Sequence, residues 1–383
     1  MSGTHRQDAG AGARAPERAS TGERLWGPTP PGALRHVLLH LLTPLLMCVG
    51  MGLAYLGAFA SPEPHQMPVA VVGSGPEAKV LAQTLHDKAG DGLDVRTVPD
   101  RATAVDQLDS RTVSGAYVMD EEHPELLVAT AGSDTSASAV EKVFTKVSDA
   151  QGTPLKVTDV APTADGDPTG QGIFFLLVAL SIGSYASVAA LGAAGSALPM
   201  RLRALLVTGT SFVVSLIGAA FAGPVFHLVD HGLWGVWALS WLYSAGILFI
   251  GVGLHTFLKR WTTLGVMVLF VMLNFTSSGG IFRPELQNGF FASLHAFWNG
   301  AGFVEGVRDL VYFDGHDLAR NVWILFAWLA AGLVVMAAAG LTERRRRAAA
   351  ATPAPDPTPV QAPIPAQHKE VDAEEEMEEA VAV

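Results

Sequence analysis

"LGVMVLFVML" (264–273) leads directly into "NFTSSGGIFRPELQNGFF" (274–291), so a segment that begins like a membrane helix becomes polar and rich in glycine. The apolar part is shorter than the roughly 20 residues that a helix needs to cross a bilayer. Non-helical backbone at membrane depth requires protein or a water-filled cavity to satisfy its hydrogen bonds. The stretch therefore predicts a membrane segment that is interrupted near its outer end.

The residues of the break favour a chain that turns and re-enters. Gly279 and Gly280 permit unusual backbone dihedrals and close approach of other groups. Pro284 suits the first turn of a new helix. We expect two short helices, near 284–298 and 302–312, that dip into the outer leaflet. The alternative is a simple outer loop that lies on the membrane without a functional cavity.

The composition of the whole chain also indicates a membrane protein. Of 383 residues, 49% are hydrophobic and only 16% are charged, and the mean hydropathy is +0.32. We therefore expect an α-helical polytopic membrane protein with six transmembrane helices and an extracytoplasmic α/β domain inserted between the first two. The six apolar stretches lie near 38–60, 171–194, 204–228, 233–255, 262–282 and 321–341.

The first apolar stretch has a second interpretation as a secretory signal peptide, because Ala58, Phe59 and Ala60 form a small-x-small pattern. A signal peptide usually has an apolar region of about 7 to 15 residues close to the N-terminus. Here the apolar region is longer and about 35 residues precede it. We therefore expect residues 34–60 to remain as an uncleaved first transmembrane helix, which Pro44 kinks.

The distribution of Lys and Arg predicts the orientation, because short cytoplasmic loops are enriched in these residues. Every second connection is basic, which places both termini in the cytoplasm and residues 61–170 and 283–320 outside. We expect disordered cytoplasmic ends at 1–33 and 343–383, the latter basic and then acidic, and a five-helix membrane domain over 171–342. The basic residues are Arg24, Arg35, Arg201, Arg203, Lys259, Arg260 and Arg344–Arg347.

Residues 61–170 alternate between strand-like and helix-like patterns. Such alternation favours a small sheet with helices packed on it. The strand candidates are "PVAVVG", "LDVRTV", "SGAYVMD", "ELLVATAG" and "LKVTDV", and the helix candidates are "PEAKVLAQTLHDKAG", "RATAVDQLDSR" and "SASAVEKVFTKVSDAQG".

Charge and motifs exclude several functions. The net charge is −11, and residues 61–170 carry 18 acidic against 8 basic side chains, which argues against nucleic acid as a partner. No Gly-Lys pair occurs, so the chain has no Walker A loop and any ATP hydrolysis belongs to another chain. The acidic residues at the end of the chain indicate a solvated tail or, alternatively, a docking tail for a basic partner.

One histidine pair has the spacing of metal ligands. In "HLVDH" (227–231), His227 and His231 would lie one helical turn apart with Asp230 between them. Inverted zinc-protease motifs carry Glu in place of that Asp. A hydrolase site therefore remains a minor alternative, and we expect no metal and no cofactor.

Residues 274–315 also carry a resemblance to a known family. Together with the topology, they resemble the ABC-2 type transporter permeases, in the branch of the YhgE/Pip and DUF3533 membrane proteins. The resemblance covers about residues 34–342. The matching positions are Asn274, Ser278, Gly279, Gly280, Pro284, Phe290, Phe291, Arg308, Tyr312, Phe313 and Gly315.

The resemblance implies a multi-pass protein of the cell membrane, here of bacterial plasma-membrane type. It would export, or flip outward, a hydrophobic or amphipathic substrate as a homodimer or heterodimer with a separate ATPase subunit. The second candidate function is an ATP-independent envelope receptor or secretion scaffold whose outer domain binds a partner.

Two segments are candidate functional sites. The loop "GAAGSALPMRLR" is short enough to transmit a push into two helices, so Leu198, Pro199, Arg201 and Arg203 are the candidate ATPase contacts; alternatively, its arginines only set topology. In "GFVEGVRDLVY" (302–312), Glu305 and Arg308 share a polar helix face. An unpaired charge at mid-membrane costs at least about 2.5 to 3.5 kcal/mol. We expect these two side chains either to pair in a poorly hydrated place or to be solvated at the interface.

Overall fold

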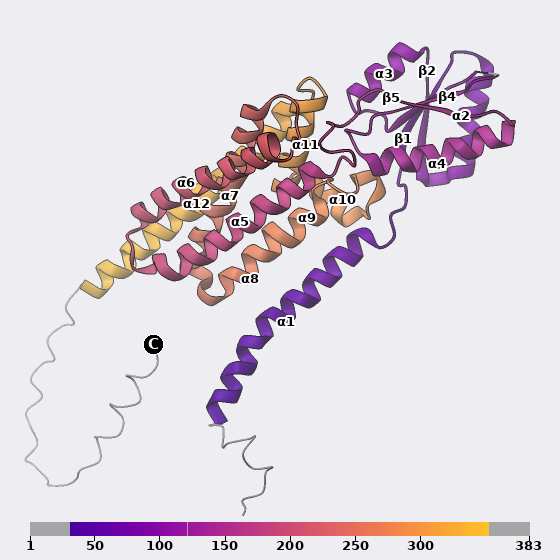
Figure 1. The fold of residues 1–383 in the computed structure, drawn as a ribbon. Coiled ribbons are helices and arrows are strands. Elements are labelled where there is room, and N and C mark those ends of the chain that lie inside the picture. Colours follow the sequence, from indigo (N-terminus) through magenta and orange to yellow (C-terminus); the bar gives the residue numbers. More distant parts are fainter. Residues whose placement is uncertain (1–30, 121, 352–383) are drawn as a thin grey trace, which may run out of the picture. The chain divides into compact units, whose positions relative to one another are not determined.

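The computed structural model describes residues 31–120 and 122–351 (Figure 1). The expectations for residues 1–30 and 352–383 lie outside the described residues. The first element of the described residues is a long helix, α1 (Pro31–Phe59), which contains Pro44. It then enters an α/β domain before continuing into a series of apolar helices.

The α/β domain contains each strand and helix that the sequence predicts, with small shifts of the boundaries. The elements are β1 (Met67–Val72), α2 (Pro76–Ala89), β2 (Leu93–Val98), α3 (Arg101–Asp109), β3 (Gly115–Val118), β4 (Glu125–Val128), α4 (Asp134–Gln151) and β5 (Lys156–Asp159), with a 3-10 turn, η1 (Gly90–Gly92), before β2.

The five strands form one mixed sheet in the order β2-β1-β3-β4-β5. The pairs β1–β2, β1–β3 and β4–β5 are parallel, and β3–β4 is antiparallel. Alternate strand residues face opposite sides, so β1 packs Val69 and Val71 with α2 and α4, and packs Ala70 and Val72 with α3. Both faces of the sheet are therefore covered by helices.

Two loops of the α/β domain, and its connections to the apolar helices, lie at one edge of this sheet, at the ends of the strands. Because β3 and β4 are antiparallel, the start of β3 and the end of β4 lie at the same edge. The loop that contains Arg111 precedes β3, and the loop that contains Ser133 follows β4. The chain also enters β1 and leaves β5 at this edge, since these strands are parallel to β3 and β4 respectively. The connections to the apolar helices start there.

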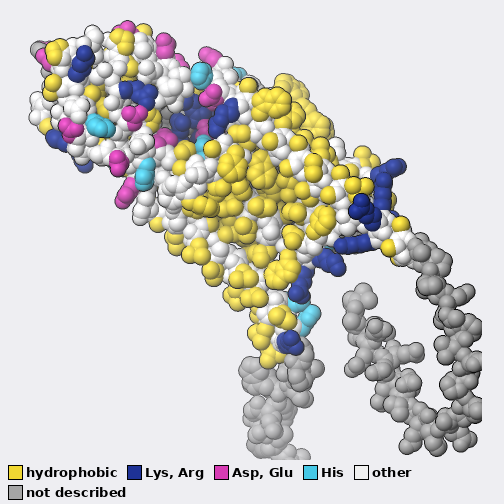
Figure 2. Space-filling model, turned by 180° about the vertical axis from the view of Figure 1, so that it is seen from behind, with side chains coloured by type: hydrophobic (Ala, Val, Ile, Leu, Met, Phe, Trp, Pro, Cys, Tyr) yellow, Lys and Arg dark blue, Asp and Glu magenta, His cyan; other side chains and the backbone are white. Residues whose placement is uncertain are grey.

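The described residues contain five helical stretches that are long and apolar enough to cross a membrane. Hydrophobic side chains form a broad surface over these helices, whereas acidic side chains gather on the α/β domain (Figure 2). These features indicate a membrane protein. The stretches are Leu34–Phe59, Gly172–Gly192, Met200–Val225, Leu233–Ser277 and Leu318–Ala350.

The helices that carry these stretches are interrupted by short turns of 3-10 or π geometry. Two turns of π geometry lie within apolar segments, and such turns in α-helices are frequent at functional sites. The elements are α5 (Gly172–Ala194), η2 (Gly195–Ala197), α6 (Met200–Ala220), η3 (Phe221–Val225), α7 (Leu233–Leu258), η4 (Lys259–Trp261), α8 (Thr262–Met267), η5 (Val268–Met272), α9 (Leu273–Ser277), η6 (Pro284–Leu286), α10 (Gly289–His295), α11 (Asn299–Tyr312) and α12 (Leu318–Ala351).

The stretch Leu233–Ser277 is two segments that fold back on each other. The chain turns at Lys259, whose φ is +49°. The amide of Asn274 donates a hydrogen bond to the hydroxyl of Tyr243 at 2.7 Å. In one straight helix these residues would lie about 46 Å apart. The second segment, 262–277, is about 24 Å long as a helix, which is shorter than the hydrocarbon core of a bilayer.

Helix α7 lies at the centre of the helical core, where Tyr243, Ile247 and Leu248 are fully buried. Helix α1 is exposed along most of its length and meets α9 and its preceding turn, where Tyr55 approaches Phe275 edge-on. The last helix continues to Ala351, so residues 343–351 are helical, although the sequence predicts a disordered tail from 343 onward.

Candidate functional site: a buried polar junction

The interruption predicted at residues 274–291 is present and has a defined shape. Helix α9 ends at Ser277, and Gly279 follows with a φ of +75°, which favours glycine. Pro284 begins only the short 3-10 turn η6, and the helix predicted near 284–298 is limited to α10, Gly289–His295. The second predicted helix is α11, which begins at Asn299, earlier than the predicted residue 302. The side chain of Asn288 caps α10 by accepting hydrogen bonds from the backbone of Phe290 and Phe291.

The carbonyl groups that the break frees are bonded by side chains from elsewhere in the fold. Protein, and not a water-filled cavity, therefore satisfies this non-helical backbone. The acceptors and their donors are Thr276 O with Gln287 Nε2 (2.7 Å), Ser277 O with His295 Nδ1 (3.0 Å), Gly279 O with Arg308 Nη1 (2.8 Å), Gly280 O with Arg308 Nη2 (3.3 Å) and Ile281 O with Thr135 Oγ1 (2.7 Å).

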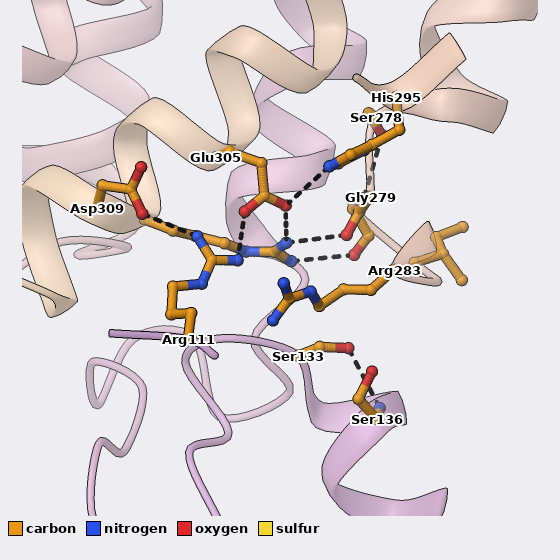
Figure 3. Close-up of polar contacts among 12 residues, drawn as sticks. Arg111, Ser133, Ser136, Ser278, Gly279, Arg283, His295, Glu305 and Asp309 are labelled. Atoms are coloured by element: carbon orange, nitrogen blue, oxygen red, sulfur yellow. Dashed lines mark hydrogen bonds and ion pairs between the residues drawn. The ribbon is translucent and has the colours of Figure 1, made fainter. Parts of the chain in front are cut away.

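A cluster of charged side chains surrounds the two glycine carbonyls (Figure 3). Besides bonding these carbonyls, Arg308 donates to Glu305 Oε1 at 3.2 Å. Arg111, from the loop after α3, forms an ion pair with Glu305 and a second with Asp309 at 2.8 Å. Asn321 of α12 donates to the other oxygen of Asp309 at 2.7 Å. We call Arg111, Glu305, Arg308 and Asp309 the junction cluster.

The junction cluster is removed from solvent. The exposed fractions of the side chains of Arg111, Glu305, Arg308 and Asp309 are 10%, 7%, 2% and 1%. The sequence leaves open whether Glu305 and Arg308 pair or are solvated, and in the structure they are paired and buried. Charges in such surroundings are stable only when they are paired and hydrogen-bonded, which is the arrangement seen here.

The charges of the cluster set the protonation of its members. Burial by itself would raise the pKa of Glu305, but the positive charges of Arg111 and Arg308 outweigh it and hold that pKa below its ordinary value. Burial raises the pKa of Asp309, and Arg111 offsets this only in part. Burial also lowers the pKa of His295, whose Nδ1 donates to the carbonyl oxygen of Ser277 at 3.0 Å.

A second polar network lies beneath the break, inside the helical core. Tyr243 is fully buried, and its hydroxyl lies 2.5 Å from Ser181 Oγ and accepts from Asn274 at 2.7 Å. The carbonyl oxygen of the Asn274 side chain accepts from the backbone of Gly300, the second residue of α11, at 2.8 Å. The predicted site residue Asn274 therefore joins α7 to α11 directly, and α5 is connected through the hydroxyl of Tyr243.

The α/β domain is joined to the break by further contacts around Glu285. Its carboxylate accepts hydrogen bonds from the hydroxyl groups of Ser114 at 3.2 Å and Ser136 at 3.3 Å. Its backbone carbonyl accepts from the backbone of His65 at 2.8 Å. Arg111 also lies over the ring of Phe313, 5.1 Å from its centre. The domain thus contacts both the turn after the break and the end of α11.

The other predicted site residues do not join this cluster. In the loop between α5 and α6, Pro199 is exposed and Leu198 is half-buried, and Arg201, in the first turn of α6, is exposed. Arg203 is buried and donates to the carbonyl of Leu198 at 3.0 Å, so it holds the loop in shape. A protein partner can reach Pro199 and Arg201 but not Arg203.

The histidine pair at 227–231 is not on a helix. His227 has a φ of +51°, and the chain is irregular from His227 to Gly232, so the helical spacing that suggested a metal site is absent. Among the described residues, no group of three or more His, Cys, Asp or Glu side chains is placed to hold a metal ion.

Three residues of the site, Arg111, Gln287 and Asp309, were not among the predicted site residues. Arg111 and Asp309 are separated by 198 residues, so no local pattern connects them. The signal that was present is the polar face of residues 302–312, which contains Asp309 beside Glu305 and Arg308.

Comparisons of the chain with protein-family models, with curated proteins and with solved structures found no match.

Proposed function

We propose that this protein is the membrane subunit of an export system, similar to the ABC-2 type permeases, and that it works with a separate ATPase. In this proposal the chain crosses the membrane six times, with both termini in the cytoplasm and the α/β domain outside. It exports or flips a hydrophobic or amphipathic substrate, and it acts as a dimer of identical or related subunits.

The observation that carries the proposal is the buried junction cluster at the end of an interrupted helix. Ionisable residues within membrane proteins are costly, and they commonly mark pathways or moving parts. Interrupted helices have the same association with transport. Here Arg111 of the α/β domain is paired with the helix α11 that closes the break. A displacement of α11 would therefore be passed to the outer domain.

The six crossings are supported by the course of the chain and by its surface. The stretch Leu233–Ser277 turns back at Lys259, and the proposal assigns one crossing to each of its two segments. Large aromatic side chains are exposed near both ends of several apolar helices, as is typical of residues at the interfaces between lipid and water. Phe257 and Trp261 lie at the turn near Lys259, and a second set lies near the opposite ends of the helices. That second set is Phe175, Phe226, Trp234, Phe290, Phe297 and Trp323, all close in sequence to the segments that the proposal places outside.

The loop at Leu198–Arg203 is the proposed ATPase contact. Pro199 and Arg201 are exposed there, while Arg203 fixes the loop between α5 and α6. A loop that is rigid and exposed can transmit force into both helices.

The experiment that tests this proposal is purification of the tagged full-length chain in mild detergent, followed by measurement of ATP hydrolysis. We expect an ATPase to co-purify, and we expect Arg201→Glu to reduce the co-purified activity several-fold. Arg96→Glu, at an exposed position of the outer domain, is the matched control and should leave it unchanged. Absence of ATPase activity from wild-type preparations that retain function in cells would contradict the proposal.

That negative result would favour the second candidate, a receptor or secretion scaffold. One feature of the α/β domain favours this function: a groove between α2 and α4 that is lined by Leu81, Leu85 and Val147, with Lys88 and Lys146 at its rim. Such a groove presents apolar and charged groups together, as surfaces for protein partners commonly do.

A further inference from the structure

A long apolar groove lies among the helices α6, α7 and α12, away from the junction cluster. Its volume is about 470 Å³, and its walls are mostly Ala, Val, Leu and Phe side chains. They extend from Ala238 to Phe249 on α7 and from Val322 to Leu333 on α12. Ala238 and Leu333 are exposed, so the groove opens on the surface of the helical core.

The polar side chains in the wall of the groove already bond to one another and to the helix backbone. Ser211 Oγ accepts from Trp241 Nε1 at 3.1 Å and donates to the carbonyl of Thr208 at 2.9 Å. Thr208 Oγ1 donates to the carbonyl of Ala204 at 3.0 Å. Among the lining residues that the structure describes, none is charged. An apolar space of this kind offers water no partners, so its occupant must be a hydrocarbon.

The dimensions of the groove distinguish between possible hydrocarbon occupants. Ala238 to Phe249 and Val322 to Leu333 each span about 16 Å of helix, which is close to half of a hydrocarbon core of roughly 30 Å. A volume of about 470 Å³ over this length gives a mean width of about 5 to 6 Å. A helix of a second protein chain is about 10 to 12 Å wide and is too wide to enter. A single extended hydrocarbon chain fits both the length and the width.

We propose that this groove holds one acyl chain of a membrane phospholipid. Trp234 lies one turn before Ala238 on α7, Trp323 follows Val322 on α12, and both tryptophans are exposed. Exposed tryptophans mark the interface between lipid and water, so the lipid headgroup lies at this end. The chain then extends along the groove toward Phe249. This site does not depend on the proposed transport function.

The test uses a phosphatidylcholine that carries a photoreactive diazirine at the tip of one acyl chain. A trace of it is mixed with unlabelled phosphatidylcholine in vesicles that contain the purified full-length protein, and mass spectrometry locates the label after irradiation. We expect the label around Phe249 and Leu333, at several times the level found around Leu45 and Val49. The latter two side chains lie on the exposed surface of α1, outside the groove, and therefore report contact with bulk lipid.

Two variants make the test specific. Ala238→Trp fills the mouth of the groove and should reduce the label around Phe249 to the level on α1, whereas Ala327→Trp, at an exposed alanine of α12 outside the groove, should leave it unchanged. A wild-type label no higher than on α1, or an Ala238→Trp variant that keeps the excess, would overturn the proposal. Protection of the groove from the label would also overturn it and would indicate a protein neighbour there. If Ala238→Trp does not fold, Leu333→Trp at the other end replaces it, with the same expected loss around Phe249.

Discussion

Two ion clusters in this molecule use the same side-chain chemistry in opposite surroundings. In the junction cluster, Arg308 and Glu305 are 2% and 7% exposed. At the opposite edge of the sheet, where β4 begins, Glu125 pairs with Arg101 at 2.9 Å and with Lys156 at 3.4 Å, and these two cations are 49% and 68% exposed. We call the second group the sheet-edge cluster.

The difference in burial determines what each cluster does. Exposed pairs contribute about 0 to 1 kcal/mol, because water and salt replace the partner. A buried pair is weak evidence for stability by itself, but removal of one partner costs about 3 to 5 kcal/mol since an uncompensated charge remains. The junction cluster therefore fixes one arrangement of α11, the break and the α/β domain, whereas the sheet-edge cluster only adjusts the stability of that domain.

The largest effect is expected from Arg308→Met. This change removes one of the arginine partners of Glu305, and it leaves the carbonyl groups of Gly279 and Gly280 without the donors that Arg308 provides. We expect a loss of about 3 to 5 kcal/mol in the free energy of unfolding, measured by denaturant titration in detergent. The control is Arg320→Met, at an exposed arginine with one backbone contact, for which we expect about 1 kcal/mol or less. Similar losses in the two variants would remove the special role of burial.

A smaller effect is expected from Gly279→Ala, which tests the backbone of the same region. Gly279 has a φ of +75°, and an added Cβ would lie 2.6 Å from His295 Cε1 and 2.8 Å from Glu305 Oε1. We expect a loss of more than about 1 kcal/mol, because strain and the displaced Glu305 add together. Gly289→Ala is the matched control, since a Cβ there has open space. The same denaturant titration checks this pair, and a neutral Gly279→Ala variant would show that the junction tolerates movement.

The smallest effect is expected in the sheet-edge cluster, from Glu125→Gln. Hydrogen bonding to Arg101 lowers the pKa of Glu125 to about 2. An unfolded Glu has a pKa of about 4.3, so the stabilisation is present above that pH and is lost as the pH falls from about 4.3 to 2. We expect a loss of at most about 1 kcal/mol at pH 7 and a flatter stability profile over that interval. An unchanged acid profile in Glu125→Gln, measured by thermal melts at several pH values, would contradict the assignment.

The sequence predicted the elements of the fold better than it predicted the contacts between them. Alternating strand and helix patterns identified β1 to β5 and their helices, because the spacing of hydrophobic residues along the chain depends directly on local secondary structure. Gly279 and Pro284 similarly marked the break. The pairing of Arg111 with Glu305 and Asp309 is set by the strand order and by the docking of the domain, which leave no periodic signal in the sequence.

The histidine pair at 227–231 is a case in which a local pattern suggested a site that the fold does not form. The spacing of His227 and His231 has meaning only on a helix, and the chain there is irregular. The preceding π turn, with Pro224 inside it, ends α6 before the pair begins. A spacing argument therefore depends on a boundary that local sequence defines only to within a few residues.

The most direct test of the account is a double-mutant cycle between Arg111 and Glu305, with Arg111→Met, Glu305→Gln and the double variant, compared with the same cycle for Arg101 and Glu125. Such cycles isolate the energy of one pair from the other effects of each change. We predict a coupling of about 2 to 3 kcal/mol for Arg111 with Glu305 and of less than about 1 kcal/mol for Arg101 with Glu125. A coupling near zero for Arg111 with Glu305 would contradict the claim that this buried pair joins the α/β domain to the segment around the interrupted helix.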